Sequence, residues 1–262
     1  MRASTSATRI LALLALAPFA LPRMVRAQVD EIQVYDGGLA PQGTFTLTLH
    51  NNFTPQGLMT PAFAGGVVPD HAFNGVPEWA YGVTGWFEAG LYLPLYSVGK
   101  TAGHTTAMLD GVKLRFLFAV PRADDRTFFY GVNLEFSYNA RHWDPTRLTS
   151  EIRPIIGWHL HPVDLILNPI FDTAYDGLDD VDFAPATRVA CDLSRAWRLA
   201  IEEYADFGPV HQFRSGNQQT HQLYGVVDHH AKALDIEAGV GFGLTDVSDK
   251  ITLKLILARD LK

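Results

Sequence analysis

Charged residues at alternate positions of otherwise apolar stretches are the first residues in this sequence whose chemistry needs an explanation. Lys113 and Arg115 form one such pair, and Glu151 and Arg153 form another. The ten residues that we place in this class are Glu88, Lys113, Arg115, Glu135, Glu151, Arg153, Arg188, Glu202, Glu237 and Lys254. Facing a common interior, they would either line a path whose mixed charges select solutes, or pair with one another and close that path.

Histidine is the second residue type that invites a chemical role, because imidazole is a common metal ligand. His159 and His161 share one face of a predicted strand, and His229 adjoins His230. Neither pair is completed by a cysteine or a carboxylate at a spacing that metal sites use. We therefore expect these histidines to be plain polar residues, and we expect no metal site.

An enzyme that acts on lipid would need a serine–histidine pair with a third group that orients the histidine. His142 and Ser150 are the nearest candidates, and no nucleophile elbow accompanies them. Gly239, Gly241 and Gly243 lie on one strand face without the helix that a dinucleotide-binding loop requires. The sequence therefore predicts a protein that is not an enzyme and that has no cofactor.

Composition narrows the class of protein further. A hydrophobic content of 47% excludes general disorder, and a net charge of −7 without a Lys/Arg cluster predicts no nucleic-acid partner. Cys191 is the only cysteine, which excludes a scaffold held together by internal disulfides. No linker or change in composition marks a domain boundary after the N-terminal region, so we expect one large domain.

The elements that would position the charged residues are strands, because apolar and polar residues alternate with a period of two. In the stretch 44–50, Phe45, Leu47 and Leu49 fall on one face and threonines fall on the other. The runs with clear alternation are 44–50, 112–120, 128–139, 149–160, 234–243 and 251–258. Weaker runs at 72–84, 87–96, 163–175, 182–193, 197–207 and 220–229 bring the predicted number of strands to about twelve.

Connection lengths indicate how these strands are arranged. Short turns alternate with longer segments along the chain, as expected when strands run up and down through a membrane with short turns on the periplasmic side. Trp86, Trp158 and Trp197 flank the short turns, and Tyr138 and Tyr175 lie near the opposite strand ends. Two such aromatic belts suit the two membrane interfaces. A soluble periplasmic β-sandwich that binds a ligand has the same alternation and is an alternative.

The first residues resemble an export signal. Arg2 and Arg9 precede an apolar run at 10–21, which is too short to cross a bilayer as a helix. Small residues before Gln28 predict cleavage at that point. We therefore predict a signal peptide at 1–27, a periplasmic N-terminal segment at 28–42 and an outer-membrane barrel at 43–262.

Several stretches resemble a group of proteobacterial outer-membrane proteins known as transporters of the meta-pathway phenol-degradation type. The stretches that carry the resemblance are 32–37 (IQVYDG), 41–43 (PQG), 78–84 (EWAYGVT), 131–138 (GVNLEFSY) and 151–154 (EIRP). The resemblance implies an outer-membrane barrel and uptake of small organic compounds, aromatic ones among them. It brings no catalytic residues with it.

The sequence thus predicts an all-β protein, an antiparallel up-and-down transmembrane β-barrel of about twelve strands in the bacterial outer membrane. The predicted function is a narrow, porin-like channel or transporter for small solutes. Its expected partners are outer-membrane lipid, the outer-membrane assembly machinery and those solutes. An outer-membrane hydrolase that modifies lipid is the alternative from another functional class.

Overall fold

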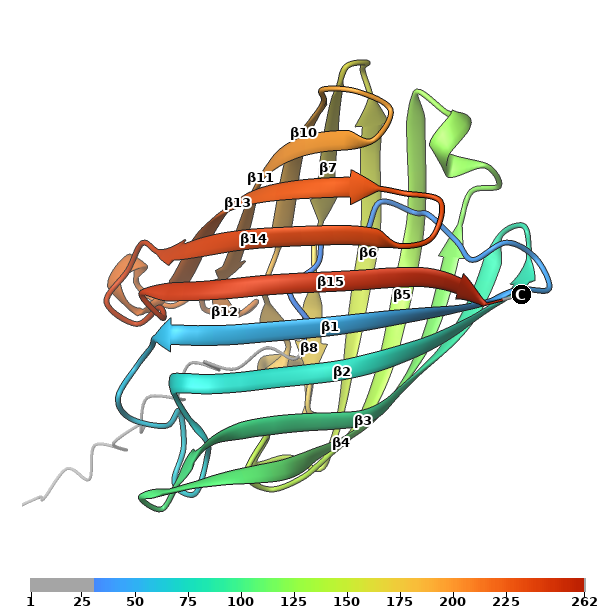
Figure 1. Ribbon diagram of the computed structural model, residues 1–262. Helices are drawn as coiled ribbons and strands as arrows, with labels where there is room; N and C mark the ends of the chain where they lie inside the picture. The colour runs from blue at the N-terminus through green and yellow to red at the C-terminus, as the bar shows by residue number, and fades with distance from the viewer. Residues whose placement is uncertain (1–30, 262) are drawn as a thin grey trace, which may run out of the picture.

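One antiparallel sheet closes on itself to form a β-barrel in the computed structural model, which describes residues 31–261 (Figure 1). The sheet contains fifteen strands, and the additional pairing of β6 with β7 closes it. Three short strands, β8, β9 and β12, lie outside the ring, which leaves twelve strands in the barrel wall. The predicted fold class is therefore confirmed, and the two packed sheets of a soluble sandwich are not what the chain forms.

The strands of the ring are all connected to their neighbours in antiparallel register. They are β1 (Phe45–Gln56), β2 (Val68–Thr84), β3 (Phe87–Thr101), β4 (His104–Ala119), β5 (Phe128–Asn139), β6 (Leu148–His159), β7 (Val163–Asn168), β10 (Ala186–Asp192), β11 (Trp197–Asp206), β13 (Thr220–His230), β14 (Asp235–Gly243) and β15 (Ile251–Leu261). The connections contain β8 (Phe171–Thr173), β9 (Asp182–Phe183) and β12 (Gly208–Pro209), and the 3-10 turns η1 (Ala123–Asp125), η2 (Leu178–Asp180) and η3 (Gly216–Gln218).

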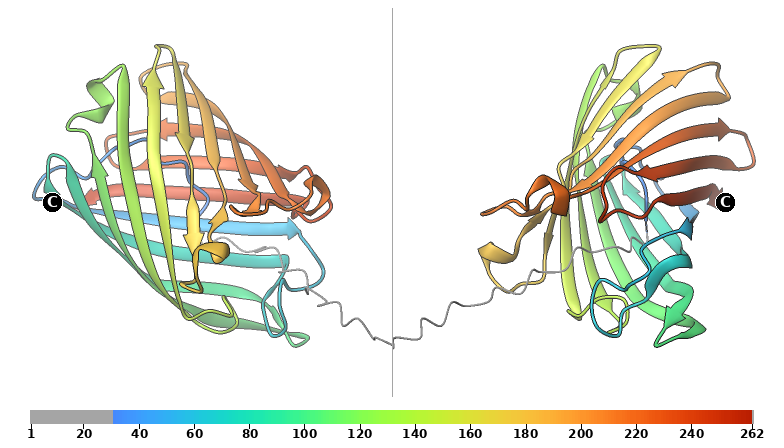
Figure 2. Two further views of the ribbon diagram at one scale, coloured as in Figure 1. Left: turned by 180° about the vertical axis from the view of Figure 1, so that it is seen from behind. Right: turned by 90° about the vertical axis from the view of Figure 1, so that its left-hand side faces the viewer.

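The first and the last strand of the chain are neighbours in the ring. Phe45 of β1 lies opposite Leu261 of β15 at one end of the barrel, and Gln56 lies opposite Ile251 at the other end. Figure 2 shows β5, β6 and β7 on the far side of the barrel from β1 and β15. A closed ring pairs the backbone groups of every strand, which a bilayer core requires because it offers no water to bond them.

The two ends of the barrel differ in their connections. The end that carries Phe45 and Leu261 also carries the short connections, such as the turn between Thr84 and Phe87. The opposite end carries the long loops, including residues 57–67, 140–147 and 207–219. The predicted alternation fails at one connection of this end, because β3 and β4 are joined there by the two-residue turn 102–103. We call these the short-turn end and the long-loop end.

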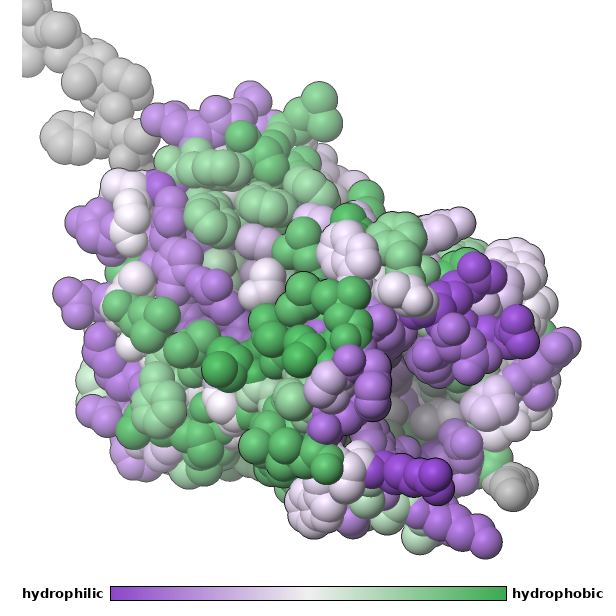
Figure 3. Space-filling view, turned by 90° about the horizontal axis from the view of Figure 1, so that it is seen from above, coloured by the Kyte–Doolittle hydropathy of each residue, from purple (hydrophilic) through white to green (hydrophobic). Residues whose placement is uncertain are grey.

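Side chains alternate between the outside and the inside of the wall. Leu114 is 48% exposed on the outside, whereas its neighbour Arg115 is 4% exposed on the inside. Figure 3 shows a wide apolar area on one side of the barrel, with hydrophilic residues toward its two ends. Exposed Trp86 and Trp197 lie at the short-turn end, and exposed Tyr138 lies at the long-loop end. This distribution is that of a barrel whose apolar band faces lipid.

Glycines inside the wall make room for aromatic rings. The ring of Phe129 on β5 lies over Gly157 on β6, where an added Cβ would be 2.0 Å from a ring carbon. The ring of Tyr224 on β13 lies over Gly241 on β14 in the same way, at 2.3 Å. Both rings are fully buried, and they therefore fill interior space that these glycines leave open.

Two of the predicted strands are interrupted, which the alternation of residues did not indicate. The run 163–175 is divided into β7 and β8, and the run 182–193 is divided into β9 and β10. Pro169 and Pro185 lie at the two interruptions, and neither has an N–H to give to the sheet. Beyond the interruptions β8 pairs with β6, and β9 pairs with β8 and β12, so the wall continues to the long-loop end.

The predicted signal peptide, 1–27, and its cleavage site before Gln28 lie outside the described residues. Within residues 31–261, no helix is long and apolar enough to cross a bilayer.

Candidate functional site

The ten charged residues predicted to share one interior all lie on the inner face of the barrel. Eight of them are buried, and Glu151 and Glu237 are partly buried, with side chains 17% and 18% exposed. Each makes at least one ion pair with another interior residue. Buried charges require such partners, because removal from water without compensation is costly. Whether they also line a path for solutes stays a prediction.

The first charge network lies on β1 to β4. Arg115 contacts two carboxylates, Glu78 at 2.7 Å from Nη2 and Glu88. His50 Nε2 lies 3.0 Å from Oε2 of Glu78 and extends the network to β1. Sequence analysis placed Arg115 and Glu88 in the interior but did not single out Glu78. The alternation around Glu78 is weak, because the inward neighbours Ala80 and Gly82 are small.

The same side of the barrel carries a second group of charges on β4, β5 and β6. Lys113 Nζ lies 2.7 Å from Oε2 of Glu135, and Asn133 Nδ2 donates a hydrogen bond to Oε1 of Glu135 at 2.8 Å. Arg153 donates to both carboxylate oxygens of Glu151, at 2.6 and 3.1 Å. The two cations are therefore each matched to one carboxylate of the wall.

Another network occupies the opposite wall, on β10 to β15. Arg188 contacts Glu202, Asp228 and Glu237. Lys254 contacts Glu202 and lies 2.6 Å from Oε1 of Glu237. Three carboxylates and two cations thus share one water-poor region of the lumen. Asp228, which lies in one of the weakly alternating runs, was not among the predicted residues.

The described part of the N-terminal segment, residues 31–42, lies inside the barrel and bridges these networks. Arg153 Nη1 donates to the carbonyl oxygen of Gln33 at 3.0 Å, and Lys254 Nζ donates to that of Ile32 at 3.3 Å. The backbone N–H of Ala40 donates to Glu88 nearer the short-turn end. The sequence predicts a periplasmic segment at 28–42; of these residues, 28–30 lie outside the described residues, and 31–42 occupy the lumen.

Tyr35 connects this segment to several strands of the wall. Its ring contacts two guanidinium groups, with the ring centroid 5.3 Å from Cζ of Arg115 and 4.7 Å from Cζ of Arg153. Its hydroxyl is 2.8 Å from the hydroxyl of Tyr92 on β3. Cations over an aromatic face are attracted to it, most strongly when both are removed from water. Tyr35 therefore joins the segment to the charged wall as well as to the apolar interior.

Apolar side chains of the barrel wall also pack against the segment. Val34 and Tyr35 pack in a buried cluster with Leu117, Phe129 and Ile155. Ile32 packs in a second cluster on the opposite wall. The segment thus contacts both sides of the lumen and narrows it between the long-loop end and the short-turn end.

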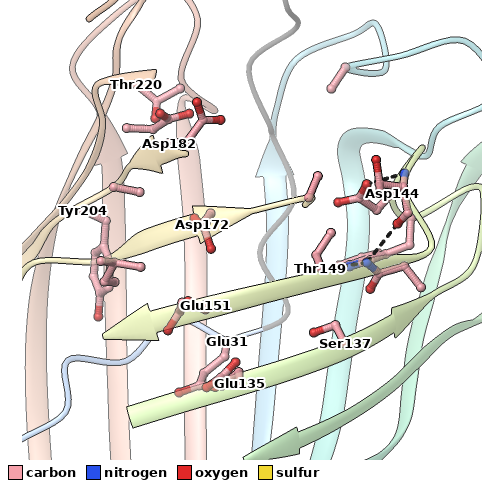
Figure 4. Close-up of a pocket in the computed structure, with 18 of the residues that line it drawn as sticks. Glu31, Glu135, Ser137, Asp144, Thr149, Glu151, Asp172, Asp182, Tyr204 and Thr220 are labelled. Carbon is pink, nitrogen blue, oxygen red and sulfur yellow. Dashed lines mark hydrogen bonds between the residues drawn. The ribbon is translucent and has the colours of Figure 1, made fainter. Parts of the chain in front are cut away.

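A cavity of about 520 Å³ opens above this constriction, toward the long-loop end. We call it the vestibule. Its carboxylates are those of Glu31, Glu135, Asp144, Glu151, Asp172, Asp176, Asp180, Asp182, Asp206 and Asp249, and its bases are those of Lys113, Arg153 and Arg214. Figure 4 shows Glu31, Glu135 and Glu151 together at the inner end and Asp172 and Asp182 farther out. Ten acidic against three basic residues make the vestibule strongly acidic.

Asp249, in the loop between β14 and β15, joins two loops at the rim of the vestibule. Its Oδ1 accepts a hydrogen bond from the backbone N–H of Leu58 at 2.8 Å. Burial raises the pKa of Asp249 to about 6, with nearby Asp70 acting in the same direction and the Leu58 hydrogen bond opposing both. Part of the rim charge therefore changes between mildly acidic and neutral pH.

The residues considered for metal binding and catalysis have other partners. His159 lies 2.8 Å from Asp164, and His230 lies 3.3 Å from Asp235. No group of three or more metal-ligating side chains gathers in residues 31–261. The two residues weighed for a hydrolase are also separately engaged, because His142 contacts Asp110 at 2.8 Å and Ser150 contacts Tyr175.

No family model matches the chain, and no curated protein matches it either. Among solved structures it is similar to an outer-membrane channel from Pseudomonas putida F1, with a TM-score of 0.61 and 13% identity over 88% of this chain and 100% of that one. LpxR from Salmonella typhimurium matches 82% of this chain and 99% of its own, with a TM-score of 0.44 and 5% identity. OprD from Pseudomonas aeruginosa has a TM-score of 0.40 and 11% identity over 82% of this chain and 66% of its own.

These likenesses concern the fold. The first supports the β-barrel fold, which is the coarser part of the resemblance seen in the sequence. The other two are too distant to support an inference about this chain. The finer resemblance, to transporters of the meta-pathway phenol-degradation type, stays a prediction.

Proposed function

We propose that this protein is a narrow channel of the bacterial outer membrane, through which small solutes pass. The observation that supports this most is the acidic vestibule of about 520 Å³, which leads from the long-loop end to a charged lumen. Twelve-strand barrels lie between small barrels filled by side chains and wide porins, so a narrow path suits this ring size. The loops of the long-loop end would face the outside of the cell.

The apolar outer band supports the outer-membrane location. Its exposed leucines, isoleucines and aromatic residues would contact lipid, and the predicted signal peptide would bring the chain to the periplasm. Lipid and the assembly machinery of the outer membrane are accordingly its proposed partners. In this proposal the protein is not an enzyme and needs no cofactor.

The charge of the vestibule supports a preference among solutes. Ten carboxylates around a confined space concentrate cations and repel anions, because low-dielectric walls focus the field. Small cations and neutral compounds are therefore the proposed solutes. Small organic compounds, aromatic ones included, agree with the family resemblance seen in the sequence.

Conductance of the purified protein in a planar bilayer tests this function. In a tenfold gradient of KCl we expect discrete channel openings and a reversal potential that shows preference for K⁺ over Cl⁻. A variant with both Asp176→Asn and Asp180→Asn, which neutralises two vestibule residues, is expected to shift the reversal potential toward zero. A barrel that is folded, as shown by heat-modifiable migration on a denaturing gel, and yet silent would contradict the proposal.

A further inference from the structure

Glu31 lies at the inner end of the vestibule with an unusual lack of hydrogen bonds. It is 3% exposed, and neither of its carboxylate oxygens has a hydrogen-bond partner in residues 31–261. It forms one long ion pair, in which Nη1 of Arg153 lies 3.8 Å from Oε1, but this Nη1 donates its hydrogen bond to the carbonyl oxygen of Gln33. A buried carboxylate without hydrogen bonds is costly, so such a group in a native structure points to a missing partner.

The surroundings of Glu31 add negative charge. Glu135 and Glu151 lie beside it at the inner end of the cavity (Figure 4). Lys113 is paired with Glu135, and Arg153 is paired with Glu151. Both of these cations thus have a shorter ion pair with another carboxylate than with Glu31, whose two oxygens accept no hydrogen bond.

We propose that the inner end of the vestibule binds a small organic cation through N–H groups that it donates to the carboxylate of Glu31. A primary ammonium or a guanidinium group both carries the missing positive charge and supplies the missing hydrogen bonds. A metal ion fits less well, because no group of three or more metal-ligating side chains occurs in the described part of the chain. The inference names the solute class of the proposed channel, and it rests on that function for the route by which the cation arrives.

The cavity has room and suitable walls for the rest of such a molecule. A volume of about 520 Å³ is in the range of sites for small ligands. Leu95, Ile170 and Tyr204 line it beside the carboxylates and would contact the carbon chain. The site would thus take a short aliphatic amine or diamine and reject carboxylates of the same length.

The test is isothermal titration calorimetry on the folded mature barrel in detergent, with 1,4-diaminobutane as the probe. The neutral 1,4-butanediol and the anionic succinate have the same carbon chain and serve as matched ligands. We expect binding of diaminobutane alone, and a loss of affinity of at least tenfold in Glu31→Gln. Asp246→Asn, which removes one charge from an exposed loop residue outside the cavity, is expected to bind as the unaltered protein does.

A second variant distinguishes a specific binding site at Glu31 from general electrostatic attraction by the acidic vestibule. Asp176→Asn removes one charge from the outer part of the same cavity and is expected to lower affinity less than threefold. Equal losses in Asp176→Asn and Glu31→Gln, or binding of butanediol as tight as that of diaminobutane, would overturn the proposal. If a preparation conducts K⁺ but does not bind diaminobutane, the proposed site is wrong and the proposed channel stands. If a folded barrel binds diaminobutane but does not conduct, the site stands and the channel is wrong.

Discussion

Asn168 holds Tyr35 through both of its backbone groups, as a neighbouring strand would. The Oδ1 of Asn168 accepts from the N–H of Tyr35 at 2.7 Å, and its Nδ2 donates to the carbonyl oxygen of Tyr35 at 3.0 Å. Asn168 is the last residue of β7 and is fully buried. The side chain of Asn168 thus provides hydrogen-bond partners for both backbone groups of Tyr35, in a segment that lies away from the sheet.

Substitution of Asn168 by alanine should therefore release the segment. Two buried hydrogen bonds at about 1 kcal/mol each stabilise the docked segment by about 2 kcal/mol, which corresponds to about 30-fold faster exchange of the Tyr35 amide. Hydrogen exchange followed by mass spectrometry measures this, and conductance in the same variant should rise. Asn51→Ala, at a partly exposed position on β1 outside the lumen, is the control. Unchanged exchange at residues 31–42 would show that Asn168 does not hold the segment.

Lys254 is the cation whose removal should cost the barrel most. Its ammonium group is fully buried against Glu202 and Glu237, so Lys254→Met leaves the three carboxylates of this network to share one cation, Arg188. We expect a loss of about 3–5 kcal/mol in the free energy of unfolding, measured by denaturant titration in lipid vesicles. Adding Glu237→Gln to Lys254→Met should restore part of that loss.

Lys250 provides the matched comparison for this experiment. It forms an exposed pair with Asp246 at 3.5 Å on a loop, and such pairs contribute about 1 kcal/mol or less. Lys250→Met should therefore change stability little. Equal effects of Lys250→Met and Lys254→Met would contradict the stated role of the interior network.

The pH dependence of stability should contain a contribution from Asp249. Its pKa is about 6 in the folded protein and 3.8 for the free side chain. Between these values the folded state keeps a proton that the unfolded state has lost, so its stability falls as pH rises from 4 to 6. The fall is on the order of 3 kcal/mol.

Asp249→Asn should flatten this part of the profile, because asparagine does not titrate and its Oδ1 still accepts from Leu58. Denaturation midpoints at pH 4, 5, 6 and 7 in vesicles provide the measurement. A profile with the same slope in both proteins would exclude Asp249 as its source.

Gly157 should tolerate no side chain while Phe129 is in place. A Cβ at Gly157 would lie 2.0–2.5 Å from three ring atoms of Phe129. We expect Gly157→Ala to destabilise the barrel by about 1–3 kcal/mol, and the double variant with Phe129→Leu to recover part of it. Gly85→Ala, where no heavy atom lies within 4 Å, should be close to neutral. Refolding yield and denaturation midpoints decide between these outcomes.

Much of the barrel could be predicted from the sequence, because a period of two is a direct consequence of strand geometry. Lys113 and Arg115 were assigned to the interior since their neighbours Leu114 and Phe116 are apolar. Their ion-pair partners could not be assigned, because pairing depends on which strands are adjacent and in which register. Arg115 reaches Glu78 across β3, and no property of either residue's own strand indicates that.

The position of residues 31–42 inside the barrel could not be predicted from the alternation of residues, for a different reason. The segment has no pairing strand over most of its length, and side chains from distant strands supply its partners. Asn168 is 133 residues from Tyr35, and Lys254 is 222 residues from Ile32. Alternation in a single stretch carries no information on contacts of this kind.

The hydrogen bond from Lys254 to Ile32 has a consequence for the order of assembly. Lys254 belongs to the last strand, and Ile32 precedes the first. In a sheet that has not closed, β1 and β15 are the two edge strands. Lys254 and Ile32 are therefore far apart until β15 pairs with β1. We therefore expect the docked segment and the closed ring to stabilise each other, because this hydrogen bond joins the segment to the strand that completes the wall.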